Sequence, residues 1–314
     1  MGKADDLTKN YIRQNDRFAD VCNFYLFNGR QLVNPDELEE QDTTELEVIL
    51  GDGKSASVQK FRDVLKKTVV KSDGKAMYMI VGVENQHDIH YAMTIKNMVY
   101  DSLNYASQVE KIAQNHREAK ELKGAEFLSG FAKTDRLIPV VTITIYWNSG
   151  EWDGPRTLHE MFEMENEEIL QYVSDYKLNL IVPDEIKDFS KFATELKSVF
   201  EIVGVSDNKN EFLNYCKNSL GTEISYEAAN LLDECLGTHF SAASMEGGPV
   251  SMCKAVEELT QESRAEGRAE GRAEGRAEVY ASLVVRNKMS KEEAAQEAGM
   301  SMEEFEKFLS AAQA

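Results

Sequence analysis

Two apolar runs separated by a short polar turn form the clearest pattern in the chain. Residues 61–70 and 76–84 are rich in apolar and β-branched side chains, and Asp73-Gly74 lies between them. An Asp-Gly pair flanked by such runs predicts a β-hairpin with a two-residue type I′ loop. Ser72 would then pair with Lys75, and each earlier residue would face one equally far beyond the turn.

This register places two carboxylates opposite each other. Asp63 and Glu84 are equally distant from the turn, so their Cβ atoms would lie about 4.5–5.5 Å apart. Gln86 shares the face of Glu84, because side chains alternate along a strand. Opposed carboxylates repel one another, and a divalent cation held between them would remove the repulsion. The pattern fits metal-assisted phosphodiester chemistry, and it fits equally two acids at a solvated strand end.

Apolar periodicity predicts alternating helices and strands along the rest of the first 235 residues. The first two are a helix over 8–28 that stops at Gly29 and a strand over 43–50 followed by a Gly51-Asp52-Gly53 turn. After the hairpin come a helix from 93 to about 120 and a buried strand over 137–147. A strand over 176–182, ended by Pro183, and helices between 186 and 235 complete the series. This order predicts an α/β fold.

Several separated segments resemble the PD-(D/E)XK nuclease family transposases, which are related to the recombination-promoting nucleases and the YhgA-like transposases. The segments are Arg62–Leu65, Gly82–Gln86, Met93–Tyr100, Ile145–Trp152 and Arg156–Glu160. The resemblance covers roughly residues 10–205, and the repeat-rich tail also resembles family tails. It implies a restriction-endonuclease-like PD-(D/E)XK core, with a mixed sheet flanked by helices, and a helical C-terminal region.

The resemblance also implies an activity and roles for particular residues. It implies a magnesium- or manganese-dependent endonuclease that hydrolyses DNA, with Asp63 and Glu84 as the metal ligands. Gln86 matches the third signature position, where the wider superfamily usually has lysine; its neutral amide can orient a water but cannot supply charge. Lys96 would lie near the scissile phosphate. Tyr100 lies one helical turn after Lys96, and it matches a family tyrosine or is a core aromatic residue.

The sequence predicts four consecutive parts. They are a nuclease-like domain over 1–185, a helical subdomain over 186–246, a linker and repeat helix over 247–280, and a small helix-turn-helix-like unit over 281–314. Two capping boxes start helices in the last part, one at Ser290 with Glu293 and one at Ser301 with Glu304.

A four-residue repeat precedes that unit. Residues 264–278 read RAEGRAEGRAEGRAE. Glycine at every fourth position and like charges at i,i+4 make the isolated helix marginal. The segment could pair with a copy of itself, so that Arg and Glu stripes face each other, or serve as a solvated spacer. A homo-oligomer through the repeat and the C-terminal helices is the corresponding partner prediction.

Net charge works against the nuclease interpretation. The formal net charge is −20 and the pI about 4.8, values that oppose strong electrostatic affinity for nucleic acid. A local group of basic residues surrounds the predicted site, namely Lys60, Arg62, Lys66, Lys67, Lys71, Lys75 and Lys96. These side chains contact DNA or only keep a strand edge soluble. With the neutral Gln86, the charge favours an alternative function, a catalytically inactive scaffold or protein-interaction module with the same fold.

Other polar residues near the site have two interpretations each. Asp16 and Asp20 lie one turn apart on the first predicted helix, where an acid could reach the metal through water; a solvated face is the simpler expectation. His87 and His90 follow Glu84 closely, but their spacing is not that of a helical metal-binding pair. They are metal ligands, substrate contacts or surface residues.

The cysteine positions and the hydropathy of the chain indicate the cellular compartment. Cys22, Cys216, Cys235 and Cys253 are scattered and form no CxxC pair, so neither a zinc site nor a disulfide framework is expected. No apolar run is long enough to span a bilayer, and the first residues lack the apolar core of a signal peptide. A cytoplasmic protein that does not interact with membranes is predicted.

Overall fold

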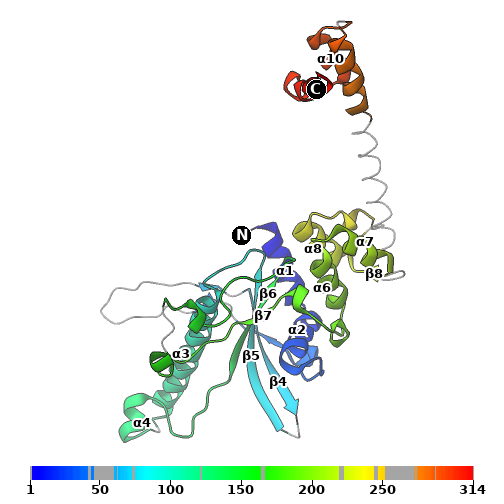
Figure 1. Cartoon of the computed structure of the whole chain (residues 1–314). Coiled ribbons are helices and arrows are strands. Elements are labelled where there is room, and N and C mark those ends of the chain that lie inside the picture. Colours follow the sequence, from blue (N-terminus) through cyan, green and yellow to red (C-terminus); the bar gives the residue numbers. More distant parts are fainter. Residues whose placement is uncertain are drawn as a thin grey trace. The chain divides into compact units, whose positions relative to one another are not determined.

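The chain forms two compact units in a computed structural model, Met1–Met252 and Cys253–Ala314 (Figure 1). Each unit is considered by itself. The structure describes residues 2–41, 44–45, 60–61, 63–72, 75–120, 122–163, 167–218, 223–243, 247–251, 272, 274–286 and 288–313.

A five-stranded mixed sheet lies at the centre of the first unit. Its strands are ordered β1 (Glu39–Glu40), β4 (Val64–Ser72), β5 (Lys75–Gln86), β6 (Val140–Tyr146) and β7 (Asn179–Ile181). The pairs β1–β4 and β4–β5 are antiparallel, whereas β5–β6 and β6–β7 are parallel. The predicted α/β fold with a mixed sheet is therefore confirmed.

The register of the β4–β5 hairpin is the one that the turn predicts. Ser72 pairs with Lys75, and the ladder continues without a slip to the pair Val64 and Val83. Asp63 directly precedes β4, so the next position of the ladder sets it against Glu84. Asp73-Gly74 itself lies outside the described residues.

The middle strands are buried on both faces. Consecutive residues of a strand point to opposite faces, and Val83 and Glu84 in β5, like Ile143 and Thr144 in β6, are all at most 1% exposed, as expected of strands with helices on both sides. The buried strand predicted over 137–147 is confirmed as β6. A separate pair of short strands, β2 (Thr44–Glu45) and β3 (Lys60–Phe61), is antiparallel; the strand predicted over 43–50 and the turn after it lie mostly outside the described residues.

The predicted first helix is two helices. They are α1 (Lys3–Arg13) and α2 (Asn15–Phe27), because Gln14 has an extended backbone with φ −63° and ψ 134°. The break frees the Arg13 carbonyl, and the ammonium group of Lys66 donates to it. The stop at Gly29 is confirmed: its φ is +87°, and a Cβ there would lie 2.8 Å from Cβ of Lys191.

Helices cover both faces of the sheet. Figure 1 shows the long helix α3 (Met93–Ala119) on the side opposite α2. The helix predicted from 93 to about 120 is confirmed. The predicted helical region after 186 contains α6 (Leu196–Val205), α7 (Lys209–Asn218) and α8 (Tyr226–Leu236), and α8 packs on both α1 and α6.

Shorter elements connect these parts of the first unit. They are η1 (Pro35–Glu37), α4 (Gly124–Ser129), η2 (His159–Met161), α5 (Glu167–Leu170), η3 (Pro183–Glu185), η4 (Phe189–Lys191), β8 (Glu223–Ile224), η5 (Phe240–Ala243) and β9 (Val250–Ser251). None of the helices formed by the described residues is both long and apolar enough to cross a membrane.

The second unit has its own small core. Helical residues 274–285 pack with α10 (Lys291–Ala298) and α11 (Met302–Gln313), and Phe305 is fully buried among alanines. Ser301 and Glu304 form the predicted capping box in both directions. Most of the four-residue repeat lies outside the described residues.

Candidate functional site

The predicted acidic pair lies where β4 begins and β5 ends. The backbone N–H of Asp63 donates to Oε1 of Glu84 at 3.3 Å. The Glu84 side chain is only 1% exposed. Asp63 and Glu84 border a cleft of about 790 Å³ that Gln86 and Lys96 also line. The structure thus brings together all four side chains that the sequence predicted for the site.

Lys96 belongs to the first turns of α3, and its ammonium group lies 2.8 Å from Oε2 of Glu84. This ion pair connects the helix to the sheet and places the positive charge of Lys96 beside Glu84, the most buried carboxylate of the cleft. Tyr100, one turn later, is 3% exposed and has its ring 5.7 Å from the ammonium group. It is buried, as expected of a core aromatic residue, and it also lines the cleft.

Two residues that the sequence did not indicate orient Asp63. The backbone N–H of Asn85 donates to Oδ2 of Asp63 at 2.8 Å, and the Asn85 side-chain amide lies 3.4 Å from the same oxygen. Oδ1 of Asn85 accepts a hydrogen bond of 2.7 Å from the indole N–H of Trp147. Because an indole can only donate, this bond directs Nδ2 of Asn85 towards Asp63.

The acidic pair has the donor chemistry that a hard divalent cation requires. Oxygen ligands from one or two carboxylates, completed by water and phosphate, are typical of Mg²⁺. Within the described part of the chain, both hydrogen bonds that Asp63 accepts end on Oδ2, which leaves Oδ1 available to a further ligand. No group of three or more His, Cys, Asp or Glu that could hold a metal occurs among the described residues; the candidate ligand set is these two acids.

A third carboxylate enters the cleft from α1. Asp5 and His87 both line it, and Oδ1 of Asp5 lies 3.8 Å from Nε2 of His87. Asp5 is the fifth residue of the sequence, and no local pattern links it to the hairpin. Only the packing of α1 against β4 and β5 brings it there.

The two acids predicted on the first helix do not reach this cleft. Asp20 is 1% exposed, and its carboxylate accepts hydrogen bonds from the backbone N–H groups of Ala193 and Thr194 at 2.9 and 2.8 Å. The expectation that Asp20 lies on a solvated face is therefore wrong, because its side chain caps the segment before α6. Asp16 is exposed, as predicted.

Most of the predicted basic group serves the fold. Lys66 is 2% exposed and binds the backbone of Arg13. Lys71 forms an ion pair with Glu37, and the ammonium group of Lys67 lies 4.7 Å from the ring centre of Tyr78. The side chains of Lys60, Arg62 and Lys75 lie outside the described residues. Among the predicted basic residues that the structure describes, Lys96 alone lines the cleft.

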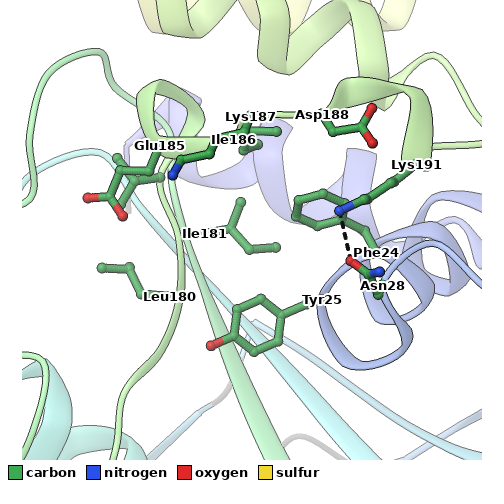
Figure 2. A pocket seen from close by; sticks show the side chains of 11 residues that line it. Phe24, Tyr25, Asn28, Leu180, Ile181, Glu185, Ile186, Lys187, Asp188 and Lys191 are labelled. Atoms are coloured by element: carbon green, nitrogen blue, oxygen red, sulfur yellow. Dashed lines mark hydrogen bonds between the residues drawn. The ribbon is translucent and has the colours of Figure 1, made fainter.

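A second cavity, of about 340 Å³, lies between α2 and the segment that follows β7 (Figure 2). Tyr25 and Ile181 face it. Several of its polar side chains are held by neighbours: Lys191 donates to Asn28 at 2.7 Å, and Glu185 forms an ion pair with Arg156. It contains none of the predicted site residues, so the cleft at Asp63 is the stronger candidate.

Comparison of the chain with protein-family models, with curated proteins and with solved structures finds no match.

Proposed function

We propose that the protein is a metal-dependent endonuclease that hydrolyses phosphodiester bonds of DNA, built on a PD-(D/E)XK core. The observation that supports this most is the convergence of Asp63, Glu84 and Lys96 at one end of the sheet. Two carboxylates from opposite positions of the hairpin and a cation from the following helix line one open cleft. Metal ligands and a phosphate-binding cation are the groups that phosphoryl hydrolysis needs.

Each residue of the cleft has its own role in the proposed hydrolysis. Asp63 and Glu84 hold the divalent cation, Mg²⁺ or Mn²⁺, which when bound supplies an acidified water and neutralises negative charge on the phosphate. Asn85 fixes the Asp63 carboxylate. Lys96 is within reach of both Glu84 and the cleft, so its ammonium group can contact a non-bridging phosphate oxygen. Gln86 orients a water molecule through its amide, without adding charge.

A catalytically inactive scaffold or interaction module is the second candidate function. Asp5, Asp63, Glu84 and Asp88 all line the cleft, whereas Lys96 is the only lysine or arginine among the lining residues that the structure describes. Without a bound cation this cleft repels a phosphate backbone. The two candidates therefore make opposite predictions about divalent ions: a nuclease binds them at Asp63, whereas a scaffold has no need of them.

Plasmid cleavage by the purified full chain tests the proposal. Nicking is expected with Mg²⁺ or Mn²⁺ and not with EDTA, and Asp63→Asn is expected to abolish it. Asp6→Asn is the matched control, because Asp6 is an exposed carboxylate of α1 outside the cleft. Absence of cleavage by folded wild-type protein, with no Mg²⁺ binding by calorimetry, would favour the scaffold. Equal cleavage by wild type and Asp63→Asn would exclude this site.

A further inference from the structure

His87 has the surroundings of a proton-transfer group. It follows β5 directly, and its Nε2 atom is buried with no hydrogen-bond partner among the described residues. The only carboxylate within 4 Å of that nitrogen in the described part of the chain is Asp5, whose Oδ1 lies 3.8 Å away. The side chain is 20% exposed, and the residue lines the same cleft as Asp63 and Lys96.

The two ring nitrogens of His87 differ in their surroundings. Nε2 is buried and lies 3.8 Å from Oδ1 of Asp5, so transfer of a proton to a substrate requires the other nitrogen, Nδ1. A protonated imidazole has an N–H on both nitrogens and can bind Asp5 through one while it donates from the other. At 3.8 Å the two groups are at ion-pair distance and do not form a hydrogen bond. A carboxylate paired with an imidazole is a recurrent arrangement in proton-transfer sites.

We propose that His87, held by Asp5, donates the proton to the leaving oxygen of the phosphodiester. This inference rests on the proposed nuclease function and adds a residue to it. Asp63 and Glu84 act on the attacking water and the phosphate. The roles proposed for Lys96 and Gln86 do not include protonation of the departing alkoxide either. An alkoxide is a poor leaving group, so a general acid at this position accelerates the reaction by roughly 10²–10⁴-fold.

The proton balance of the step is closed. Water attacks phosphorus, a new P–O bond forms, and one proton of that water passes to solvent. The P–O bond to the leaving oxygen breaks, and the oxygen takes the proton from Nδ1 of His87. Neutral His87 then regains a proton from solvent, so the net reaction adds one water across the phosphodiester. Asp5 is a positioning residue, because it acts only through His87.

Substrates with a sulfur leaving atom separate this role from a structural one, because a thiolate departs without protonation. Two sets of DNA duplexes are needed, in which one linkage has sulfur in place of the bridging 3′ or 5′ oxygen. Cleavage at the sulfur linkage is compared with cleavage at the neighbouring oxygen linkages of the same strand. His116→Ala is the matched control, because His116 also pairs with a carboxylate, Asp135 at 2.8 Å, but lies outside the cleft.

His87→Ala is expected to cleave oxygen linkages roughly 10²-fold more slowly than wild type and the sulfur linkage at close to the wild-type rate. Asp5→Asn is expected to show the same selectivity to a smaller degree, and His116→Ala none. Equal loss at sulfur and oxygen linkages, or no loss at either, would overturn the assignment of His87. His87→Gln replaces His87→Ala if circular dichroism shows the alanine variant unfolded. If the wild-type protein cleaves neither kind of linkage, the nuclease function itself is overturned. If the wild type is active but the His87 variant loses sulfur and oxygen cleavage equally, only the role of His87 is overturned.

Discussion

The ammonium group of Lys96 lies 2.8 Å from Oε2 of Glu84, and this ion pair joins the start of α3 to the end of β5. Glu84 is almost completely buried, and Lys96 is a cation paired with its carboxylate. Removing one partner of a buried ion pair costs far more than an exposed pair contributes, because the remaining charge loses its compensation. Lys96→Met is therefore expected to lower the free energy of unfolding by about 3 kcal/mol, measured by urea denaturation.

The double variant Lys96→Met/Glu84→Gln tests the cause of that loss. It removes both charges, so it is expected to be more stable than Lys96→Met alone. Lys71→Met is the control, because Lys71 pairs with Glu37 at the surface and exposed pairs contribute about 0–1 kcal/mol. A Lys96→Met protein as stable as wild type would show that Glu84 does not require the ammonium group.

The hydrogen bond from Trp147 to Asn85 provides a second prediction. Trp147→Phe removes the donor and leaves Oδ1 of Asn85 unpaired, which costs about 1–3 kcal/mol. It also releases the amide that lies beside Asp63, and loss of such a supporting contact lowers activity by roughly 10–100-fold. Both quantities are measured, by urea denaturation and by plasmid nicking.

Trp152→Phe is a close control for this experiment. Trp152 and Trp147 are both buried, with 4% and 1% of their surface exposed. The indole N–H of Trp152, however, has no hydrogen-bond partner among the described residues. The two substitutions remove the same atoms, but only one removes a hydrogen bond. If Trp152→Phe lost as much stability and activity as Trp147→Phe, the bond to Asn85 would not be the cause.

The sequence predicted the part of the site that local geometry determines. A two-residue turn fixes the register of a hairpin, so it also fixes that Asp63 opposes Glu84 and that Gln86 shares the face of Glu84. Lys96 follows shortly after on the next helix. These residues lie within 34 positions of one another in the chain, and their relation needs no knowledge of the tertiary fold.

The missed features depend on packing between distant segments. Asp5 reaches the cleft only because α1 packs on the hairpin, and Asn85 is oriented by Trp147, which directly follows the neighbouring parallel strand β6. Neither contact has a local sequence pattern. The break at Gln14 was missed for a related reason: glutamine is a good helix former, and the freed Arg13 carbonyl finds its donor in Lys66, far along the chain.

Magnesium is expected to stabilise the folded chain through Asp63. A ligand that binds only the native state adds about 2.7 kcal/mol to the free energy of unfolding at one hundred times its Kd. Wild type and Asp6→Asn should show the same rise in melting temperature on addition of Mg²⁺, and EDTA should reverse it. Asp63→Asn should show none, whatever its own starting melting temperature. A rise that persists in Asp63→Asn would place the ion elsewhere.

Lys66 makes stability depend on pH in the alkaline range. Burial lowers the pKa of its ammonium group below the ordinary value of 10.5. At pH values between the pKa of Lys66 in the folded protein and its pKa in the unfolded chain, the unfolded chain keeps a proton on Lys66 that the folded protein has lost. The free energy of unfolding therefore rises with pH in this range. Lys66→Met lacks this group. The stability of wild type relative to Lys66→Met is therefore expected to increase as the pH is raised from neutral towards 10.5, in urea denaturation at a series of pH values.

The neighbouring residue supplies the control for Lys66. Lys67 is on the opposite face of β4, with its ammonium group near the ring of Tyr78, so it is not enclosed by α1 and α2. Lys67→Met is therefore measured over the same pH series as the comparison for Lys66→Met. A flat difference for Lys66→Met would mean that the Lys66 ammonium group keeps its charge throughout, held by the Arg13 carbonyl and by Oδ1 of Asn15. In that case the two hydrogen bonds, and not desolvation, would determine the protonation of Lys66.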